Sequence, residues 1–218
     1  MILKDNPKPV AIRIGNIVLQ GNLTVPKNAI GIVIFSHGSG SSRLSPRNNY
    51  VATILQQKGL ATLLFDLLTE QEDSVYQNRF NIGLLTERLI DVTTWIKNYS
   101  ETKGLSIGYF GASTGAASAL RAAAFFGNDI SAVVSRGGRP DLAIKELHKV
   151  TASTLLIVGG WDDIVIQLNE KAYQKLNCNR ELKIIPEASH LFEEPGKLEE
   201  AANMAAGWFE KELSHKYE

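Results

Sequence analysis

The chain has 218 residues, of which 44% are hydrophobic and 21% are charged, and its 23 basic and 23 acidic residues cancel. This balance gives no electrostatic reason to expect nucleic acid or an anionic membrane as a partner. The single cysteine, Cys178, excludes an intramolecular disulfide and a multi-cysteine metal cluster.

The length suits one domain, which we expect to comprise residues 1–218. The N-terminal segment is polar and lacks the apolar core of a signal peptide, and no apolar run is long enough to span a bilayer. We therefore expect a cytoplasmic protein.

The predicted elements begin with a hairpin. Two β-rich runs, 10–14 and 17–25, flank Gly15-Asn16, a dipeptide typical of hairpin turns. The next run, 30–35, is apolar at nearly every position, as in a central parallel strand that is buried on both faces. Five later apolar runs are also expected to be strands, which makes eight: 60–65, 105–110, 130–134, 154–158 and 182–185.

Segments with helical periodicity separate these strands. In the clearest one, apolar residues recur at helical spacing and share one face: Leu85, Leu89, Val92, Ile96 and Tyr99. Strands that alternate with helices imply an α/β fold with a mostly parallel sheet and helices on both faces. In such sheets ligands bind outside the carboxyl ends of the strands, so catalytic residues are expected there.

The segment Gly111-Ala112-Ser113-Thr114-Gly115 follows the fifth strand and opens a helix rich in small residues. This is G-x-S-x-G in the strand–turn–helix context that gives the motif its meaning. A serine on such a sharp turn projects its hydroxyl beyond the sheet edge, and the flanking glycines avoid collisions with the neighbouring strand and helix. The pattern predicts Ser113 as a nucleophile.

Four histidines compete for the role of general base. His148 is expected on the surface near the end of a helix, and His215 lies close to the C-terminus. His37 ends the third strand and suits a structural or oxyanion-loop role. Only His190 lies after the last strand, late in the chain, which agrees with the order serine, acid, histidine that accompanies this serine turn.

Two adjacent carboxylates follow the seventh strand, Asp162 and Asp163. Either can accept a hydrogen bond from His190 and hold its tautomer, and the other can cap the helix that starts near Val165. Periodicity does not choose between them.

The loop after the third strand is expected to supply part of an oxyanion hole. Its donor is expected to be the backbone N–H of Ser39, with the N–H of Thr114 as the second donor. A phosphate-binding alternative is weak, because residues 38–42 contain neither the P-loop lysine nor the G-x-G-x-x-G spacing.

With these residues in place, the chain resembles the α/β-hydrolase superfamily, and more narrowly its dienelactone-hydrolase-like group, over nearly its whole length. The resemblance rests on four segments: 37–40, 111–115, 159–165 and 188–190. In this group the acid commonly lies in the pattern Gly, two residues, Asp, two residues, Val, which Gly159, Asp162 and Val165 match. The resemblance therefore favours Asp162 as the acid and implies an eight-stranded α/β-hydrolase sheet.

Dienelactone hydrolases carry a cysteine nucleophile, whereas this chain has Ser113, and Cys178 is far from the serine turn in sequence. The resemblance with serine in this position implies a carboxylesterase for small esters or lactones that needs no cofactor or metal. A thioesterase, acyltransferase or peptidase would use the same triad. A catalytically silent fold that binds a ligand is the alternative from another class, and the complete triad argues against it.

Superfamily members often insert a helical lid after the sixth strand, but here residues 134–141 run almost directly into the next helix. The minimal lid favours a small or exposed substrate over a long-chain lipid. Arg136, at the end of that strand, is able to bind a substrate carboxylate, although we favour an internal salt bridge with Asp141 or Asp66. Asp66 itself is expected to cap a loop. The expected partner is a small ester, and the sequence leaves the oligomeric state open.

Overall fold

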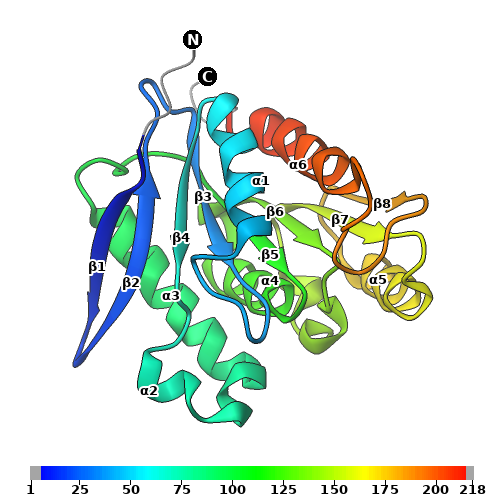
Figure 1. Ribbon diagram of the computed structural model, residues 1–218, viewed down its shortest axis with the longest axis horizontal. Coiled ribbons are helices and arrows are strands. Elements are labelled where there is room, and N and C mark those ends of the chain that lie inside the picture. Colours follow the sequence, from blue (N-terminus) through cyan, green and yellow to red (C-terminus); the bar gives the residue numbers. More distant parts are fainter. Residues whose placement is uncertain (1–5, 215–218) are drawn as a thin grey trace.

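Eight strands form one sheet in the order β1-β2-β4-β3-β5-β6-β7-β8 in the computed structural model, which describes residues 6–214 (Figure 1). The strands are β1 (Lys8–Ile14), β2 (Ile17–Thr24), β3 (Gly31–Ser36), β4 (Leu60–Phe65), β5 (Ile107–Ala112), β6 (Ile130–Arg136), β7 (Ser153–Gly159) and β8 (Arg180–Ile185). Strand β2 pairs antiparallel with both β1 and β4, and all other neighbouring strands are parallel. The predicted fold class is confirmed.

The helices cover both faces of the sheet (Figure 1). They are α1 (Pro46–Gln57), α2 (Glu70–Asp73), α3 (Ile82–Asn98), α4 (Thr114–Phe126), α5 (Asp163–Lys175) and α6 (Lys197–Ser214), with short 3-10 turns η1 (Tyr76–Phe80), η2 (Gly127–Asp129), η3 (Pro140–Ala143) and η4 (Leu147–Lys149). Helices α1 and α6 share one apolar core with one face of the sheet, and α3, α4 and α5 share another with the opposite face.

Strand β3 shows why an uninterrupted apolar run suits the centre of this sheet. All six of its residues are buried. Ile32 and Ile34 belong to the core under α3 and α4, while Val33 and Phe35 belong to the core under α1 and α6. Alternate side chains therefore enter opposite cores, as the period of a strand requires.

The amphipathic helix predicted from residues 85–99 is α3, which buries Leu85, Leu89, Val92 and Ile96. Tyr99 is the exception, because the helix ends at Asn98 and Tyr99 has extended backbone angles of φ −75° and ψ 130°. Its ring still packs on Trp95, with 4.5 Å between the ring centroids.

The connection between β6 and β7 contains only the turns η3 and η4, as expected for a minimal lid at this point. A small helical insertion lies elsewhere, between β4 and α3, where α2 and η1 project from the lower left of the molecule in Figure 1. His148 is exposed in η4, and His215 lies outside the described residues. Among residues 6–214, no helix has the length and apolar character needed to cross a membrane.

Candidate active site

Ser113 lies on a sharp turn between β5 and α4, with backbone angles of φ 51° and ψ −123°. This positive φ is rarely adopted by a residue with a side chain, and it indicates local strain. The two glycines of the motif allow the turn. A Cβ on Gly111 would lie 2.4 Å from the Cα of Ala116, and a Cβ on Gly115 would lie 2.1 Å from the carbonyl oxygen of Ser36.

The end of β6 holds this turn in place through the backbone. The N–H of Ser113 donates to the carbonyl of Arg136 at 3.3 Å, and the N–H of Arg139 donates to the carbonyl of Ser113 at 3.0 Å. As the first residue of α4, Thr114 has a backbone N–H without a partner in the helix, which leaves that donor and the positive end of the helix dipole at the serine.

His190, in the loop that follows β8, is hydrogen-bonded to Asp162, which follows β7. Its Nδ1 lies 2.6 Å from Oδ2 of Asp162, and the carboxylate accepts the Nδ1–H, so Nε2 is left unprotonated in the neutral ring. The Asp162 side chain is 17% exposed and that of His190 is 38% exposed. Asp163 begins α5 and is exposed, so the structure brings Asp162 and not Asp163 to the histidine.

Backbone contacts between two loops explain this pairing. The N–H of Trp161 donates to the carbonyl of Ala188 at 3.0 Å, and a Cβ on Gly159 would lie 2.4 Å from that same oxygen. The carboxylate of Glu194 accepts the N–H of Ser189 at 2.9 Å, and this hydrogen bond lowers the pKa of Glu194. The role of Glu194 in holding the histidine loop has no signal in the sequence.

Gly137 lies between the serine turn and the histidine loop. The residue before it, Arg136, accepts the N–H of Ser113. A Cβ on Gly137 itself would lie 3.6 Å from Cε1 of His190 and 3.0 Å from its carbonyl oxygen. The serine turn and the loop that carries His190 therefore both lie beside the end of β6, at the carboxyl edge of the sheet.

The predicted oxyanion loop lies directly on the serine. A Cβ on Gly38 would lie 3.1 Å from Cβ of Ser113 and 3.8 Å from its Oγ. The N–H of Ser39, expected to point at a developing oxyanion, donates instead to Oγ1 of Thr114 at 3.0 Å. The two residues predicted to form the hole are therefore bonded to each other through the side chain of Thr114, a contact that the sequence pattern did not indicate.

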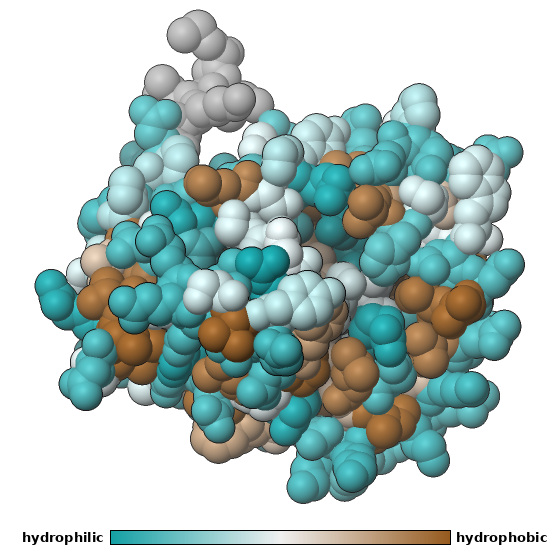
Figure 2. Space-filling view, turned by 60° about the horizontal axis from the view of Figure 1, so that its bottom comes forward, coloured by the Kyte–Doolittle hydropathy of each residue, from teal (hydrophilic) through white to brown (hydrophobic). Residues whose placement is uncertain are grey.

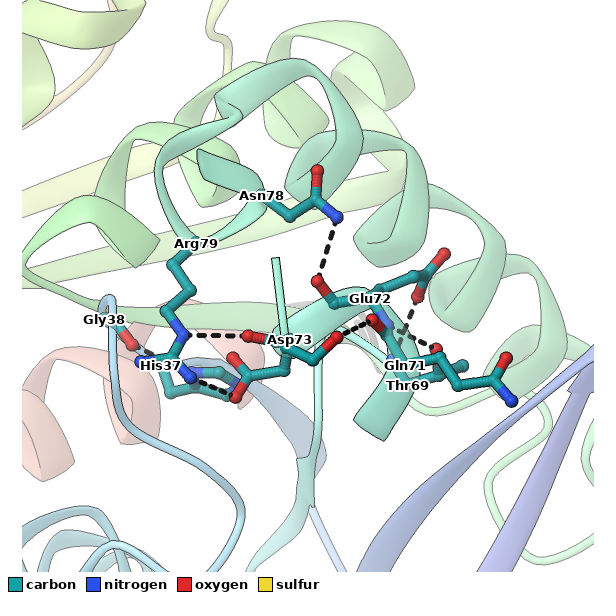
Figure 3. Close-up of polar contacts among 9 residues, drawn as sticks. His37, Gly38, Thr69, Gln71, Glu72, Asp73, Asn78 and Arg79 are labelled. Atoms are coloured by element: carbon teal, nitrogen blue, oxygen red, sulfur yellow. Dashed lines mark hydrogen bonds and ion pairs between the residues drawn. The ribbon is translucent and has the colours of Figure 1, made fainter. Parts of the chain in front are cut away.

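His37 serves this loop as a structural residue (Figure 3). Its Nδ1–H donates to the carbonyl of Gly38 at 3.0 Å, and its Nε2 accepts the N–H of Leu67 at 3.1 Å. Both ring nitrogens are therefore committed in one neutral tautomer, and burial lowers the pKa of the ring. Figure 3 shows the ring beside Asp73 and Arg79 of the β4–α3 segment, whose side chains form an ion pair at 2.7 Å.

The internal salt bridge expected for Arg136 is wrong. Asp141 is paired with Arg139 at 2.8 Å, and Asp66 is paired with Arg43, so both proposed partners are occupied. Asp66 also accepts the backbone N–H of Arg43 at 2.8 Å, which agrees with its expected role in fixing a loop. Arg136 is 6% exposed and forms no ion pair within the described part of the chain.

The loops that carry the aspartate and the histidine expose the apolar side chains of Trp161 and Leu191, and the first turn of α5 exposes Ile164. Figure 2 turns the bottom of Figure 1 toward the viewer, and there the hydrophobic side chains lie mostly in separate spots among hydrophilic ones.

Between residues 6 and 214, no cluster of three or more histidine, cysteine, aspartate or glutamate side chains is arranged to hold a metal ion.

Comparisons with known proteins identify the family and the fold. The model of the dienelactone hydrolase family matches residues 19–213. A crystal structure of a dienelactone hydrolase from Anabaena variabilis is 53% identical, with a TM-score of 0.92, and the match covers 95% of this chain and 99% of that one. Est1E from Butyrivibrio proteoclasticus, 17% identical with a TM-score of 0.81 over 94% of this chain and 99% of its own, shares the fold.

Two curated proteins of Mycobacterium tuberculosis strains, provisionally named phosphoribosyl transferases, are each 54% identical over 200 residues. The match covers 92% of this chain but 45% of each relative, so the chain spans about half the length of these proteins.

Proposed function

The chain belongs to the dienelactone hydrolase family of α/β-hydrolases, and from this premise we propose that it is a serine hydrolase for small carboxylic esters or lactones. The observation that carries the proposal is the 2.6 Å bond between His190 and Asp162 beside the strained turn of Ser113. This combination of a half-buried serine hydroxyl, a base and an orienting carboxylate is what acyl transfer requires.

In the proposed mechanism, Nε2 of His190 takes the proton of Ser113 while Oγ attacks the ester carbonyl carbon. Asp162 stabilises the imidazolium that forms. The backbone N–H of Thr114, with the 38–39 loop beside it, supports the negative charge on the carbonyl oxygen. The imidazolium then protonates the departing alkoxide, and His190 next activates a water molecule that hydrolyses the acyl-enzyme.

The position of Cys178 supports serine rather than cysteine as the nucleophile. Cys178 precedes β8, at the amino end of the strand, and its Sγ contacts Oγ1 of Thr154 at 3.6 Å. Burial raises the pKa of this thiol, which disfavours the reactive thiolate.

Phosphoribosyl transfer, the activity in the name of the mycobacterial relatives, is not what we propose for this chain. The chain corresponds to less than half of those proteins. Its glycine-rich loop packs on Ser113 instead of opening a phosphate cradle, since Gly38 lies directly against the serine. Thioester hydrolysis or acyl transfer to another acceptor would use the same residues. These activities are distinguished by the rates on different substrates.

The test is hydrolysis of 4-nitrophenyl acetate and a matching acetyl thioester by the wild type, Ser113→Ala and His190→Ala. Both variants should lose about a thousandfold or more in kcat/KM, because triad members act as a unit. His148→Ala is the matched control, since His148 is exposed in η4, and it should retain the wild-type rate. Turnover by Ser113→Ala, or a folded wild type that hydrolyses neither substrate, would contradict the proposal.

A further inference from the structure

Asn169 is a polar residue at a position of α5 where the helix pattern places apolar side chains. It lies at helical spacing between Val165 and Ala172, the other two buried residues of this helix, and it is 0% exposed. Asparagine disfavours helix interiors, and burying an amide is costly unless both of its ends are hydrogen-bonded. The Oδ1 atom is sealed from solvent and has no hydrogen-bond partner among the described residues. The stability of the helix therefore does not explain why an asparagine lies here.

The amide nitrogen of Asn169 joins α5 to the loop after β6. Its Nδ2 donates to the carbonyl of Gly138 at 3.0 Å and to the carbonyl of Val165 at 2.8 Å. Because both neighbours are acceptors, only the NH2 side of the amide can face them, which fixes the orientation of the side chain. The bond to Val165 stays within the helix, and the bond to Gly138 is the one that leaves it.

The loop that contains Gly138 holds the serine turn from both sides. The carbonyl of Arg136 accepts the N–H of Ser113 at 3.3 Å, and the N–H of Arg139 donates to the carbonyl of Ser113 at 3.0 Å. Gly138 lies between these two residues and close to the start of α4, since a Cβ on it would lie 2.6 Å from Cβ of Ala116. A shift of Gly138 would therefore be transmitted to the serine turn through short backbone contacts.

The same helix follows the acid directly. Asp162 is the residue immediately before α5, and its carbonyl accepts the N–H of Ile166 in the first turn at 2.9 Å. The side chain of Asp162 accepts the Nδ1–H of His190. Asn169 lies about two turns further along this rigid element. Its bond to Gly138 thus connects the helix that positions the acid with the loop that positions the nucleophile.

We propose that Asn169 is a positioning residue for the reaction, and that its bond to Gly138 sets the placement of Ser113 relative to the Asp162–His190 pair. The inference rests on the proposed function, because it assigns a further role in that same site. Asn169 is fully buried and acts through the backbone, so it does not touch the substrate. Its loss should therefore slow the chemical step and leave substrate binding nearly unchanged.

The kinetic test uses two variants. Asn169→Leu keeps a similar volume and removes both donated bonds, whereas the shorter hydroxyl of Asn169→Ser can still bond the carbonyl of Val165 within the helix and should fall short of Gly138. Both variants should lower kcat for 4-nitrophenyl acetate by about tenfold to a hundredfold with little change in KM, because a small displacement of reacting groups is costly. The rate is expressed per site titrated with a fluorophosphonate, so an unfolded fraction does not count. A wild-type kcat per titrated site in both variants would overturn the inference.

Thr93→Val is the matched control for the loss of a buried hydrogen bond made by a helix. Oγ1 of Thr93 in α3 lies 2.8 Å from the hydroxyl oxygen of Tyr109 in β5, and both residues are fully buried. Valine keeps the shape of threonine and removes this bond. The variant should lower the melting temperature, as Asn169→Leu does, and retain the wild-type kcat per titrated site. An equal loss of kcat in Thr93→Val and Asn169→Leu would show that any loosening of the core slows the reaction, and would overturn the assigned role.

Hydrogen exchange separates this inference from the hydrolase proposal. Mass spectrometry of the wild type and the two variants Asn169→Leu and Thr93→Val follows the peptides that contain Ser113 and Arg139. Both peptides should exchange faster in Asn169→Leu, by about tenfold, because the loop opens more often without its bond to α5, and they should exchange at the wild-type rate in Thr93→Val. Faster exchange in a protein without esterase activity would retain the connection through Asn169 and reject the hydrolase. Exchange in Asn169→Leu at the wild-type rate would reject the connection whatever the esterase activity.

Discussion

The two adjacent carboxylates after β7 have different surroundings. Asp162 accepts the Nδ1–H of His190. Asp163 is instead exposed in the first turn of α5, where the positive end of the helix dipole stabilises its negative charge. Asp162→Asn should therefore lower kcat by about a thousandfold or more, because the amide favours the wrong tautomer of His190. Asp163→Asn should change kcat little. Steady-state kinetics on a short ester decides this, and equal losses in the two variants would reject Asp162.

The bond from the N–H of Ser39 to Oγ1 of Thr114 fixes the oxyanion loop against the serine turn. Thr114→Val removes the hydroxyl and keeps the shape of the side chain. We expect it to lower kcat by about tenfold, because the loop loses the contact that orients its N–H, while Thr114→Ser retains most of the rate. A Thr114→Val rate at or above that of the wild type would instead show that the hydroxyl obstructs the site.

For individual residues, the sequence was informative where a local motif determines the backbone conformation. Gly111 and Gly115 surround Ser113 because any Cβ there would strike a neighbouring backbone. The acid could be chosen only through the family resemblance, since periodicity did not separate Asp162 from Asp163. The prediction of a salt bridge for Arg136 was wrong because Asp66 and Asp141 pair with Arg43 and Arg139. Which arginine pairs with a given carboxylate depends on the folded structure and is not visible in the sequence.

The connection between β6 and β7 bears on substrate size. It contains only two short 3-10 turns, so little of it can cover a long acyl chain. Each buried methylene is worth about 0.8 kcal/mol, and a long chain needs a covered trench to gain that energy. Acetyl to butyryl esters should therefore give a higher kcat/KM than esters of eight or more carbons.

A profile that rises toward long chains would point to the β4–α3 segment as the cover. Val75, just before the turn η1, is exposed, as are Tyr76 and Phe80 within it, and the two rings lie 5.2 Å apart. In that case Phe80→Ser should reduce the rate on octanoyl esters more than on acetyl esters. The segment is short and polar at its start, with Glu70, Glu72 and Asp73 in α2, so the sequence offered residues 70–80 only as a fallback cover.

His37 joins β3 to this β4–α3 segment and makes the junction sensitive to acid. Burial holds the pKa of His37 below the free value of about 6.5. As the pH falls through about 6.5, the imidazole therefore becomes protonated in the unfolded chain while it stays neutral in the folded chain. Stability attributable to His37 is full above that pH and declines below it. Urea unfolding at pH 7.5 and 5.5 should show a smaller loss for His37→Gln than for the wild type. Equal losses would contradict this role.

For the whole molecule, the fold class and all eight strands could be predicted, because strand and helix periods alternate cleanly along the chain. Strand boundaries were less predictable. The fifth strand begins at Ile107 and not at Leu105, since the N–H of Leu105 closes a turn onto Thr102. The order of strands could come only from the family resemblance, because a parallel neighbour is set by packing between segments that are distant in sequence.

The proposed mechanism requires Ser113 to be the activated nucleophile. A fluorophosphonate probe followed by peptide mapping tests this most directly, because the reagent reacts with a serine that a neighbouring base activates. We predict one label per chain on the peptide that contains Ser113, loss of that label in Ser113→Ala, and little change in melting temperature in this variant. Labelling of another serine, or no labelling of the folded wild type, would contradict the account.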